Sequence, residues 1–363
     1  MSLWYLSLQS SEGQFTEAGN RKMTQHYLVT GGAGFIGSNY VHRLVQRGEK
    51  VTVYDNFSRA GAQKNLKWLK ETFGEDAFNV IVGDVRDASL IAEAARDADV
   101  IVHLAGQVAV TTSVTDPRDD FESNAIGTFN TLEAARLSGR NPIFIYASTN
   151  KVYGGMEDVE LLEEPTRWRY KDLVNGCPES QPLDFHSPYG CSKGTGDQYV
   201  RDYERIYGLR SVVFRQSCIY GPRQFGIEDQ GWVAWFIIAA VTGRPITVYG
   251  DGKQVRDILN VDDLLNGYDA AIKNIGVASG KVYNMGGGPA NVMSVWAEFG
   301  PILERLCGDT IEVARGDWRP GDQRVFYADI SKAEQELGWK PKIGVEEGIH
   351  RLFDWVNANR ELF

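Results

Sequence analysis

From about Tyr27 onward, segments whose hydrophobic pattern is typical of a strand alternate with segments whose pattern is typical of a helix. Short runs rich in β-branched residues are each followed by an amphipathic segment: HYLVT precedes FIGSNYVHRLVQRG, and FNVIVGD precedes SLIAEAARDA. Strands and helices in strict turn predict right-handed crossovers and a parallel sheet covered on both faces. The pattern therefore predicts an α/β fold with a doubly wound parallel sheet, including helices near 62–72 and 117–138.

Past Arg215 the regular alternation of strands and helices ends, and the predicted elements become shorter. They are separated by segments rich in glycine and proline, such as YGPRQFG, GRPITVYGDGK and WRPGDQR. Frequent glycine and proline residues between short elements indicate a smaller second α/β domain built from loops, strands and helices. We expect an N-terminal extension at 1–23, a first domain at 24–216 and a second at 217–363. Part of 255–285 is expected to return to the first domain.

Composition and charge narrow the class of function. The chain has 363 residues, 43% hydrophobic and 24% charged, and a formal net charge of -10 without a long basic block, which argues against a nucleic-acid surface. The longest apolar run, WVAWFIIAAV, is too short to cross a bilayer, so no membrane partner is expected. Four cysteines without a CxxC and five histidines without ligand spacing predict no metal site and fit a reducing, cytoplasmic compartment. The class of function that remains is the binding or chemical conversion of a small molecule.

The strongest local motif is TGGAGFIG, with glycines at Gly31, Gly34 and Gly37 between a predicted strand and a predicted helix. This turn suits a pyrophosphate held at a helix N-terminus, as in Rossmann domains. Asp55 ends the next strand 18 residues after Gly37, where a carboxylate binds a ribose hydroxyl and repels a 2'-phosphate. The motif therefore predicts NAD in preference to NADP, although Arg59 nearby weakens that preference.

A second acid follows the third predicted strand. Asp84 in VGDVRD fits the adenine amine together with the Val85 amide, or the N-cap region of the helix in DASLIAEAA. The two roles are compatible.

A proton-transfer pair is predicted in SPYGCSKG, because Tyr189 and Lys193 would lie one helical turn apart on the same face. An ammonium favours a neighbouring phenolate, so Lys193 is expected to lower the pKa of Tyr189. A bound nicotinamide removes hydrogen from a carbinol carbon only if a base takes the hydroxyl proton, and Tyr189 is that candidate. Ser148 and Thr149 end the fifth strand, where they would hydrogen-bond the reacting oxygen or satisfy backbone groups.

TGGAGFIG, Asp55, HLAGQ, ASTNKVYG and YGCSK together resemble the extended short-chain dehydrogenase/reductase family that modifies nucleotide sugars. The resemblance runs from about Thr24 to the C-terminus. It implies a catalytic set of Thr149, Tyr189 and Lys193, with NAD as cofactor. The cofactor-binding residues that it implies are Gly31, Gly34, Phe35, Ile36, Gly37, Asp55, Asn56, Ser58, Asp84, Val85, Leu104, Ala105, Gln107, Asn124, Tyr189 and Lys193.

Longer phrases, HLAGQVAVTTS, STNKVYG, DFHSPYGCSKG and FGIEDQGWVAWF, more narrowly resemble the subfamily of CDP-tyvelose 2-epimerases, also called CDP-paratose 2-epimerases. This resemblance implies a CDP-linked hexose as substrate and epimerisation at C2 through a transient 2-keto sugar. It also implies a homo-oligomer, a dimer or a tetramer, formed through helices of the first domain.

The second domain is expected to bind the nucleotide. GDGKQVRDI offers Lys253 and Arg256, and WRPGDQR offers Arg319 and Asp322; guanidinium groups suit a diphosphate and a carboxylate suits ribose hydroxyls. Surface ion pairs are the alternative. Many relatives have an asparagine in an RxxNxYGP segment where this chain has Cys218 in FRQSCIYGP. The substrate-binding residues implied are Thr149, Cys218, Arg223, Val248, Gln254, Arg256, Arg319 and Asp322.

Several reaction classes compete. A 4,6-dehydratase of this family would need an Asp-Glu pair after Thr149, where this chain has Asn150 and Lys151. A net dehydrogenase and an epimerase are not separated by the motifs, and a C4 epimerase of a UDP-hexose is the leading alternative. A non-catalytic NAD-binding scaffold would not need the complete catalytic set. The role of His186, three residues before Tyr189, is open.

Overall fold

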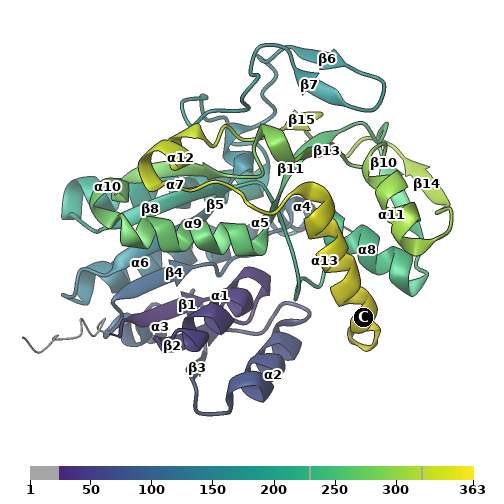
Figure 1. Cartoon of the computed structure of the whole chain (residues 1–363). Coiled ribbons are helices and arrows are strands. Elements are labelled where there is room, and N and C mark those ends of the chain that lie inside the picture. The colour runs from purple at the N-terminus through teal and green to yellow at the C-terminus, as the bar shows by residue number, and fades with distance from the viewer. Residues whose placement is uncertain (1–23, 229, 320–321) are drawn as a thin grey trace, which may run out of the picture.

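The large sheet has seven parallel strands in the order β12-β8-β5-β4-β1-β2-β3, which confirms the predicted doubly wound fold (Figure 1). The computed structural model describes residues 24–228, 230–319 and 322–363. The extension predicted at 1–23 lies outside the described residues. The strands of this sheet are β1 (His26–Thr30), β2 (Lys50–Asp55), β3 (Asn79–Val82), β4 (Val100–His103), β5 (Ile143–Thr149), β8 (Ser211–Gln216) and β12 (Lys281–Met285).

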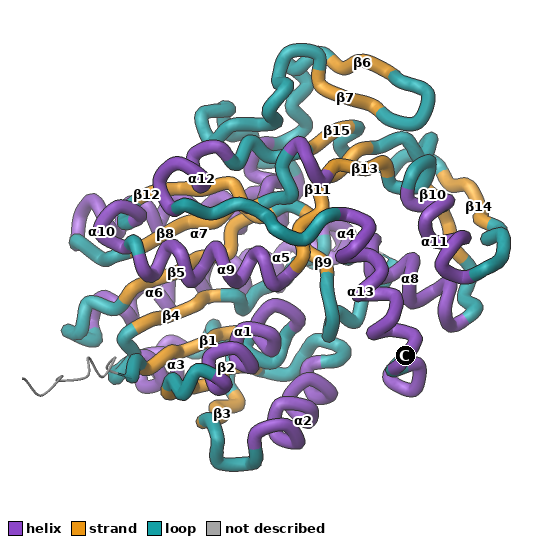
Figure 2. The backbone as a smooth tube through the Cα atoms, viewed as in Figure 1, coloured by secondary structure: helices purple, strands orange, loops and turns teal. Residues whose placement is uncertain are grey.

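Helices cover both faces of the large sheet, because its strands carry apolar side chains on both sides. One layer contains α1 (Phe35–Gln46), α2 (Ala62–Phe73), α9 (Val261–Lys273) and α12 (Ser331–Leu337). The opposite layer contains α3 (Ala88–Ala95), α6 (Gly127–Leu137) and α7 (Ser187–Tyr207). Figure 2 shows the strands between these helices. The core of this part of the molecule therefore lies in two layers that share the sheet.

The helix expected at 117–138 is interrupted. It consists of α5 (Pro117–Phe121), a π-helical turn (Glu122–Ile126) and α6, and it follows the short helix α4 (Val110–Thr115). Inserted residues of this kind re-aim the side chains that follow, which a simple helical period does not reveal.

The rest of the chain forms smaller sheets at one end of the large one. A four-stranded sheet contains β9 (Cys218–Tyr220), β11 (Val255–Asn260), β13 (Val292–Ser294) and β15 (Val325–Phe326). Two-stranded sheets pair β10 (Ile246–Tyr249) with β14 (Val313–Gly316), and β6 (Leu161–Glu163) with β7 (Trp168–Tyr170). The helices here are α8 (Trp232–Thr242), α11 (Phe299–Cys307) and α13 (Val345–Ala358), which share one hydrophobic core. The short helices are α10 (Ile275–Ala278) and the 3₁₀ turns Asn150–Tyr153, Pro289–Asn291 and Arg360–Leu362.

The apolar run at Trp232–Val241 lies in α8, whose buried side chains pack into that core. Within the described ranges, no helix combines the length and apolarity that crossing a bilayer requires.

Candidate active site

The turn between β1 and α1 has the geometry of an anion-binding loop. Gly31 has a φ of +66°, and a Cβ built on Gly37 would lie 2.2 Å from the Gly31 carbonyl oxygen. A side chain at either position would therefore strain or close the turn. Gly34 caps α1 without a side-chain hydrogen bond, and the first turn of the helix has no acidic residue. The backbone N–H groups at this helix end are thus available to a phosphate.

A cavity of about 490 Å³ opens above this turn at the carboxyl ends of the strands. Fifteen of the sixteen residues predicted to bind NAD line it: Gly31, Gly34, Phe35, Ile36, Gly37, Asp55, Asn56, Ser58, Asp84, Val85, Leu104, Ala105, Gln107, Tyr189 and Lys193. The glycine turn at one side and a carboxylate at the end of β2 fit a dinucleotide. Arg59, Gly106 and Arg223 also line this cavity. Arg59 was noted in the sequence only for its charge, and nothing in the sequence marked the other two for this cavity.

The two acids Asp55 and Asp84, which line the first cavity, differ in environment. Asp55 accepts hydrogen bonds from the backbone N–H groups of Ala33 (3.0 Å) and Phe57 (2.8 Å), which hold its carboxylate in place. Burial raises the pKa of Asp55, and these two bonds oppose that shift. Asp84 pairs with Arg86 at 2.7 Å, which lowers the pKa of Asp84 to about 2. Asp84 does not cap α3, because Asp87 is the N-cap residue.

Two predicted cofactor residues are held by internal hydrogen bonds. Asn124 does not line the cavity: its amide donates to Asp120 and to Ser192, both at 3.1 Å, inside the protein. The π-helical turn places Asn124 there, facing the backbone of Gly106. Gln107 lines the cavity, but its amide donates to the Ala109 carbonyl at 2.7 Å and to Asp120 at 3.0 Å. Its side chain is therefore already satisfied.

A second cavity of about 410 Å³ meets the first at Tyr189, which lines both. Thr149 at the end of β5 lines the second cavity, and Lys193 lines the first. Pro188 in the first turn of α7 fixes the start of that helix, and Tyr189 and Lys193 follow one turn apart. The predicted catalytic side chains thus lie where the two cavities join.

The pKa of Tyr189 depends on burial and on several neighbouring groups. Burial raises the pKa of Tyr189 to about 12, while a hydrogen bond with Thr149 and the positive charge of Arg59 lower it. Arg59 is thus a cation that favours the phenolate, and the negative charge of Asp120 opposes it. The Lys193 ammonium lies 4.4 Å from the centre of the Tyr146 ring, and burial lowers the pKa of Lys193 to about 8. Lys193 thus lies one helical turn after Tyr189, and the two side chains share the first cavity.

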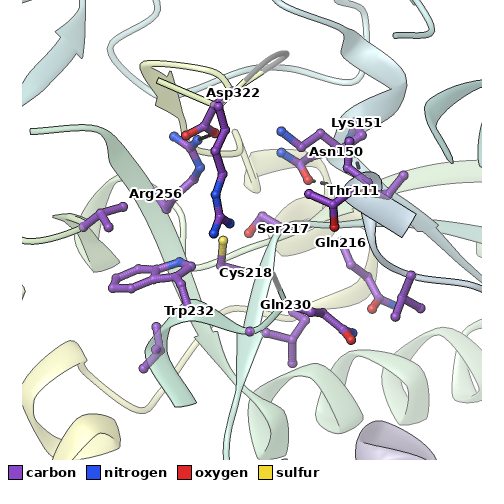
Figure 3. Close-up of a pocket in the computed structure, with 18 of the residues that line it drawn as sticks. Thr111, Asn150, Lys151, Gln216, Ser217, Cys218, Gln230, Trp232, Arg256 and Asp322 are labelled. Carbon is purple, nitrogen blue, oxygen red and sulfur yellow. Dashed lines mark hydrogen bonds and ion pairs between the residues drawn. The ribbon is translucent and has the colours of Figure 1, made fainter. Parts of the chain in front are cut away.

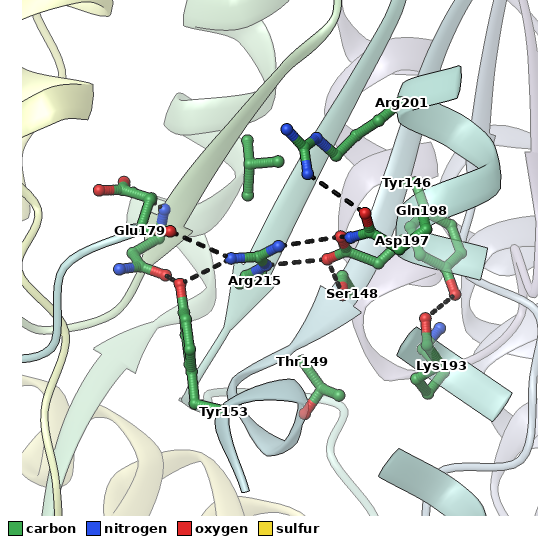
Figure 4. A network of polar contacts seen from close by, with 12 residues as sticks. Tyr146, Ser148, Thr149, Tyr153, Glu179, Lys193, Asp197, Gln198, Arg201 and Arg215 are labelled. Atoms are coloured by element: carbon green, nitrogen blue, oxygen red, sulfur yellow. Dashed lines mark hydrogen bonds and ion pairs between the residues drawn. The ribbon is translucent and has the colours of Figure 1, made fainter. Parts of the chain in front are cut away.

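Ser148 does not offer its hydroxyl to a substrate. It donates to Asp197 at 2.8 Å, and Asp197 in turn accepts two hydrogen bonds from Arg215, at 2.9 and 3.0 Å (Figure 4). All three side chains are buried. Ser148 lines both cavities, but its hydroxyl is already engaged, so Thr149 is the better candidate of the two to contact a substrate.

The second cavity is rich in charged and polar groups (Figure 3). Arg256 donates to Asp322 at 2.5 Å. The guanidinium of Arg319 lies 4.0 Å from the centre of the Tyr249 ring. The side-chain amide of Gln254 donates to the Tyr249 carbonyl at 2.5 Å. The buried side-chain oxygen of Gln254 has no hydrogen-bond partner in the protein. These groups offer both cationic and polar contacts to a nucleotide.

Cys218 also lines this cavity, and burial raises the pKa of its thiol. A protonated thiol is a weak nucleophile. This position therefore contributes shape and little charge. No cluster of three or more metal-ligating side chains occurs among the residues that the structure describes.

Three predicted substrate contacts lie elsewhere. Val248 is fully buried in the core with α8, and its neighbours Thr247 and Tyr249 line the cavity instead, because alternate residues of β10 face opposite sides. Arg223 lines the NAD-side cavity, with its guanidinium 4.1 Å from the centre of the Trp68 ring. Lys253 pairs with Glu163 of β6 at 2.8 Å. His186 pairs with Asp184 at 2.8 Å, on the partly exposed approach to α7.

Comparison with known proteins gives consistent matches along almost the whole chain. The family profile described as GDP-mannose 4,6 dehydratase matches residues 28–352. A CDP-paratose 2-epimerase from Salmonella typhi is 44% identical over 338 residues, covering 91% of this chain and 99% of that protein.

Two solved structures have the same fold. A Thermus thermophilus UDP-glucose 4-epimerase in complex with NAD has a TM-score of 0.77 and 31% identity, covering 92% of this chain and 99% of that one. A dTDP-glucose 4,6-dehydratase from Streptomyces venezuelae, also with NAD bound, has a TM-score of 0.79 and 30% identity, covering 93% and 98%.

Proposed function

The chain belongs to the nucleotide-sugar-modifying short-chain dehydrogenase/reductase family described by the GDP-mannose 4,6-dehydratase profile, and we propose that it inverts C2 of a CDP-linked hexose, CDP-paratose to CDP-tyvelose. It is a nucleotide-sugar epimerase with NAD as its cofactor. The observation that carries the proposal is that Tyr189 lines both the NAD-side and the substrate-side cavity. One phenol there faces a sugar carbon and the cofactor at once.

Tyr189, Thr149 and Lys193 have separate roles in the proposed epimerisation. Tyr189 takes the proton of the sugar 2-hydroxyl, and the neighbouring Thr149 lowers the pKa of the phenol. When bound, NAD supplies the acceptor that takes a hydride from C2 and returns it. Lys193, in the NAD-side cavity, is placed to bind the nicotinamide ribose. Tyr189 returns the proton after the 2-keto hexose has presented its other face.

The nucleotide contacts explain why the hexose turns without leaving. Arg256 and Arg319 lie in the substrate-side cavity, and Asp322 fixes the orientation of Arg256. Arginine forks bind diphosphates strongly, so the nucleotide stays anchored during the rotation. Binding energy from the part of the substrate that does not react is thereby used to keep the reactive intermediate in place.

Turnover of CDP-paratose in deuterated water tests this reaction, with the product identified by NMR. We expect CDP-tyvelose without carbon-bound deuterium, because the hydride is returned directly. Deuterium at C2 would instead show deprotonation of the carbon. Tyr189→Phe is expected to abolish turnover while retaining NAD, which distinguishes catalysis from a scaffold role.

A C4 epimerase of a UDP-hexose is the second candidate, favoured by the likeness to the UDP-glucose 4-epimerase structure. The same assay with UDP-glucose decides between them, since a C4 epimerase would form UDP-galactose. Accumulation of NADH with either substrate would indicate a net dehydrogenase.

We propose that a second copy of the chain covers α6 and α7. These helices expose apolar side chains side by side: Phe129 and Tyr199 make an edge-to-face contact and are 41% and 47% exposed, and Ile206 is 65% exposed. Contiguous exposed apolar patches mark protein interfaces, whereas single exposed apolar residues do not. Light scattering of the wild type and of Tyr199→Glu tests this, with a dimer or tetramer expected to dissociate in the variant. A monomeric wild type would contradict it.

A further inference from the structure

Lys151 lies in the substrate-side cavity without an assigned role. It belongs to the 3₁₀ turn Asn150–Tyr153, which directly follows Thr149 at the end of β5. Figure 3 shows its nitrogen end extending toward Asp322. The side chain therefore reaches from the catalytic strand toward the nucleotide-binding arginine.

Among the described residues the ammonium of Lys151 has no ion-pair partner, in contrast to Lys171 and Lys281. Lys171 pairs with Glu160 at 2.8 Å, and Lys281 with Glu336 at 2.9 Å. The charged groups that act on Lys151 are Arg256, which opposes its charge, and Asp322, which favours it. Asp322 is already engaged with Arg256 at 2.5 Å.

Around Lys151 the cavity wall thus has two cations, Lys151 and Arg256, and one carboxylate, Asp322. Burial lowers the pKa of Lys151, which means that the free site disfavours its ammonium. Lys151 is only partly buried and borders the cavity, so an anionic ligand oxygen would supply its ammonium with the opposite charge that the protein itself does not provide. A phosphate between Lys151 and Arg256 balances both charges.

The spacing along the chain gives the position of that phosphate relative to the reacting carbon. Thr149 and Lys151 are two residues apart, so their Cα atoms are separated by at most about 7 Å. That separation is on the scale of one sugar ring. A hexose whose reacting C2 lies at Tyr189 and Thr149 has its glycosidic phosphate on the neighbouring carbon, within the same cavity that Lys151 lines.

We propose that Lys151, together with Arg256, binds the sugar-bearing phosphate of the nucleotide-sugar. This inference rests on the proposed function for the substrate class. Lys151 is then a substrate-binding residue that sets how deeply the hexose enters the site. A lysine provides a compact charge that tolerates the turning of the sugar better than a rigid fork does.

The test is calorimetric titration of the NAD-loaded protein with CMP, CDP and the CDP-hexose. CMP lacks the phosphate in question, and CDP lacks the sugar. For Lys151→Met we expect the affinity for CDP to fall about 10- to 100-fold, as for loss of a hydrogen bond between charged groups, with CMP binding nearly unchanged. Lys151→Arg should restore most of the CDP affinity. Lys171→Met, which removes a surface lysine outside both cavities, is the matched control.

Each outcome decides a separate question. Unchanged CDP affinity in Lys151→Met, or equal losses for CMP and CDP, would overturn the role of Lys151. A loss confined to the CDP-hexose would assign Lys151 to a sugar hydroxyl and would also overturn it. A wild type that binds neither CDP nor UDP would contradict the proposed function instead. Lys151→Gln provides a second neutral variant if thermal unfolding shows that Lys151→Met is not folded.

Discussion

The hydroxyl of Ser148 donates a 2.8 Å hydrogen bond to the carboxylate of Asp197, which lies one helical turn after Lys193 on α7. Asp197 also accepts two hydrogen bonds from Arg215 of β8 (Figure 4). This buried network joins the strand that carries Thr149 to the helix that carries Tyr189 and Lys193. The relative position of the catalytic groups therefore depends on it.

Replacing Ser148 by alanine should loosen this junction without unpairing Asp197, which keeps Arg215. We expect a loss of about 1–3 kcal/mol in the free energy of unfolding, because one buried hydrogen bond to a charged group is removed. Denaturant unfolding measures this, and the turnover rate should fall as well. Ser138→Ala at the end of α6 removes two hydrogen bonds near the surface, one donated to the Ala135 carbonyl and one accepted from the Arg140 N–H, and serves as control. Equal stabilities of the two variants would contradict the role of the network.

Gly37→Ala should damage the dinucleotide turn. The new methyl group would lie 2.2 Å from the Gly31 carbonyl oxygen, so the backbone must shift. We expect a destabilisation of about 1–3 kcal/mol from overpacking and loss of NAD from the purified protein. Gly276→Ala is the control, since its methyl group meets no atom within 4 Å. Retention of NAD at the wild-type level in Gly37→Ala would refute this reading of the turn.

Stability should depend on His103 as the pH falls. Burial lowers the pKa of His103 to about 3 from the ordinary 6.5, and its ring nitrogens contact the hydroxyls of Thr30 and Thr128. Below the ordinary value the unfolded chain binds a proton that the folded chain does not, so stability is lost as the pH falls. The expected loss is about 2 kcal/mol between about pH 6.5 and pH 5.

The variant His103→Gln isolates this contribution. It should be less stable than the wild type near neutral pH because it perturbs two buried hydrogen bonds, but its stability should fall less between the same two pH values. Parallel losses in the two proteins, measured by denaturant unfolding, would show that other groups cause the acid dependence.

Arg59 should lower the pKa of the Tyr189 phenol. Its positive charge lowers the pKa of Tyr189, so Arg59→Met is expected to raise the pKa of Tyr189 further. The activity that requires the phenolate should then appear at higher pH. The pH profile of kcat/KM measures this shift. Arg96→Met, at an exposed position after α3, should leave the profile in place, and an unshifted profile in Arg59→Met would exclude the electrostatic role.

The sequence by itself determined the large sheet, the glycine turn and the acid that follows β2. These features depend on short-range patterns, because alternating β-rich and amphipathic segments can bury both faces only in a parallel sheet. The four-residue spacing of Tyr189 and Lys193 likewise needed only the helical period. Asn150 and Lys151 distinguished the chain from a dehydratase, but their sequence position did not show what Lys151 approaches.

Only the tertiary structure decided which side chains reach the cavities. Val248 and Tyr249 are adjacent, and packing of β10 against α8 is what buries the first and exposes the second to the cavity. Asn124 turns away because of a π-helical turn, and Arg223 lies on the NAD side because Trp68 of α2 holds its guanidinium there. Lys151 faces Arg256 across more than a hundred positions of the sequence. Such pairings follow from long-range packing, which fixes the direction of each side chain after the local pattern has fixed only its element.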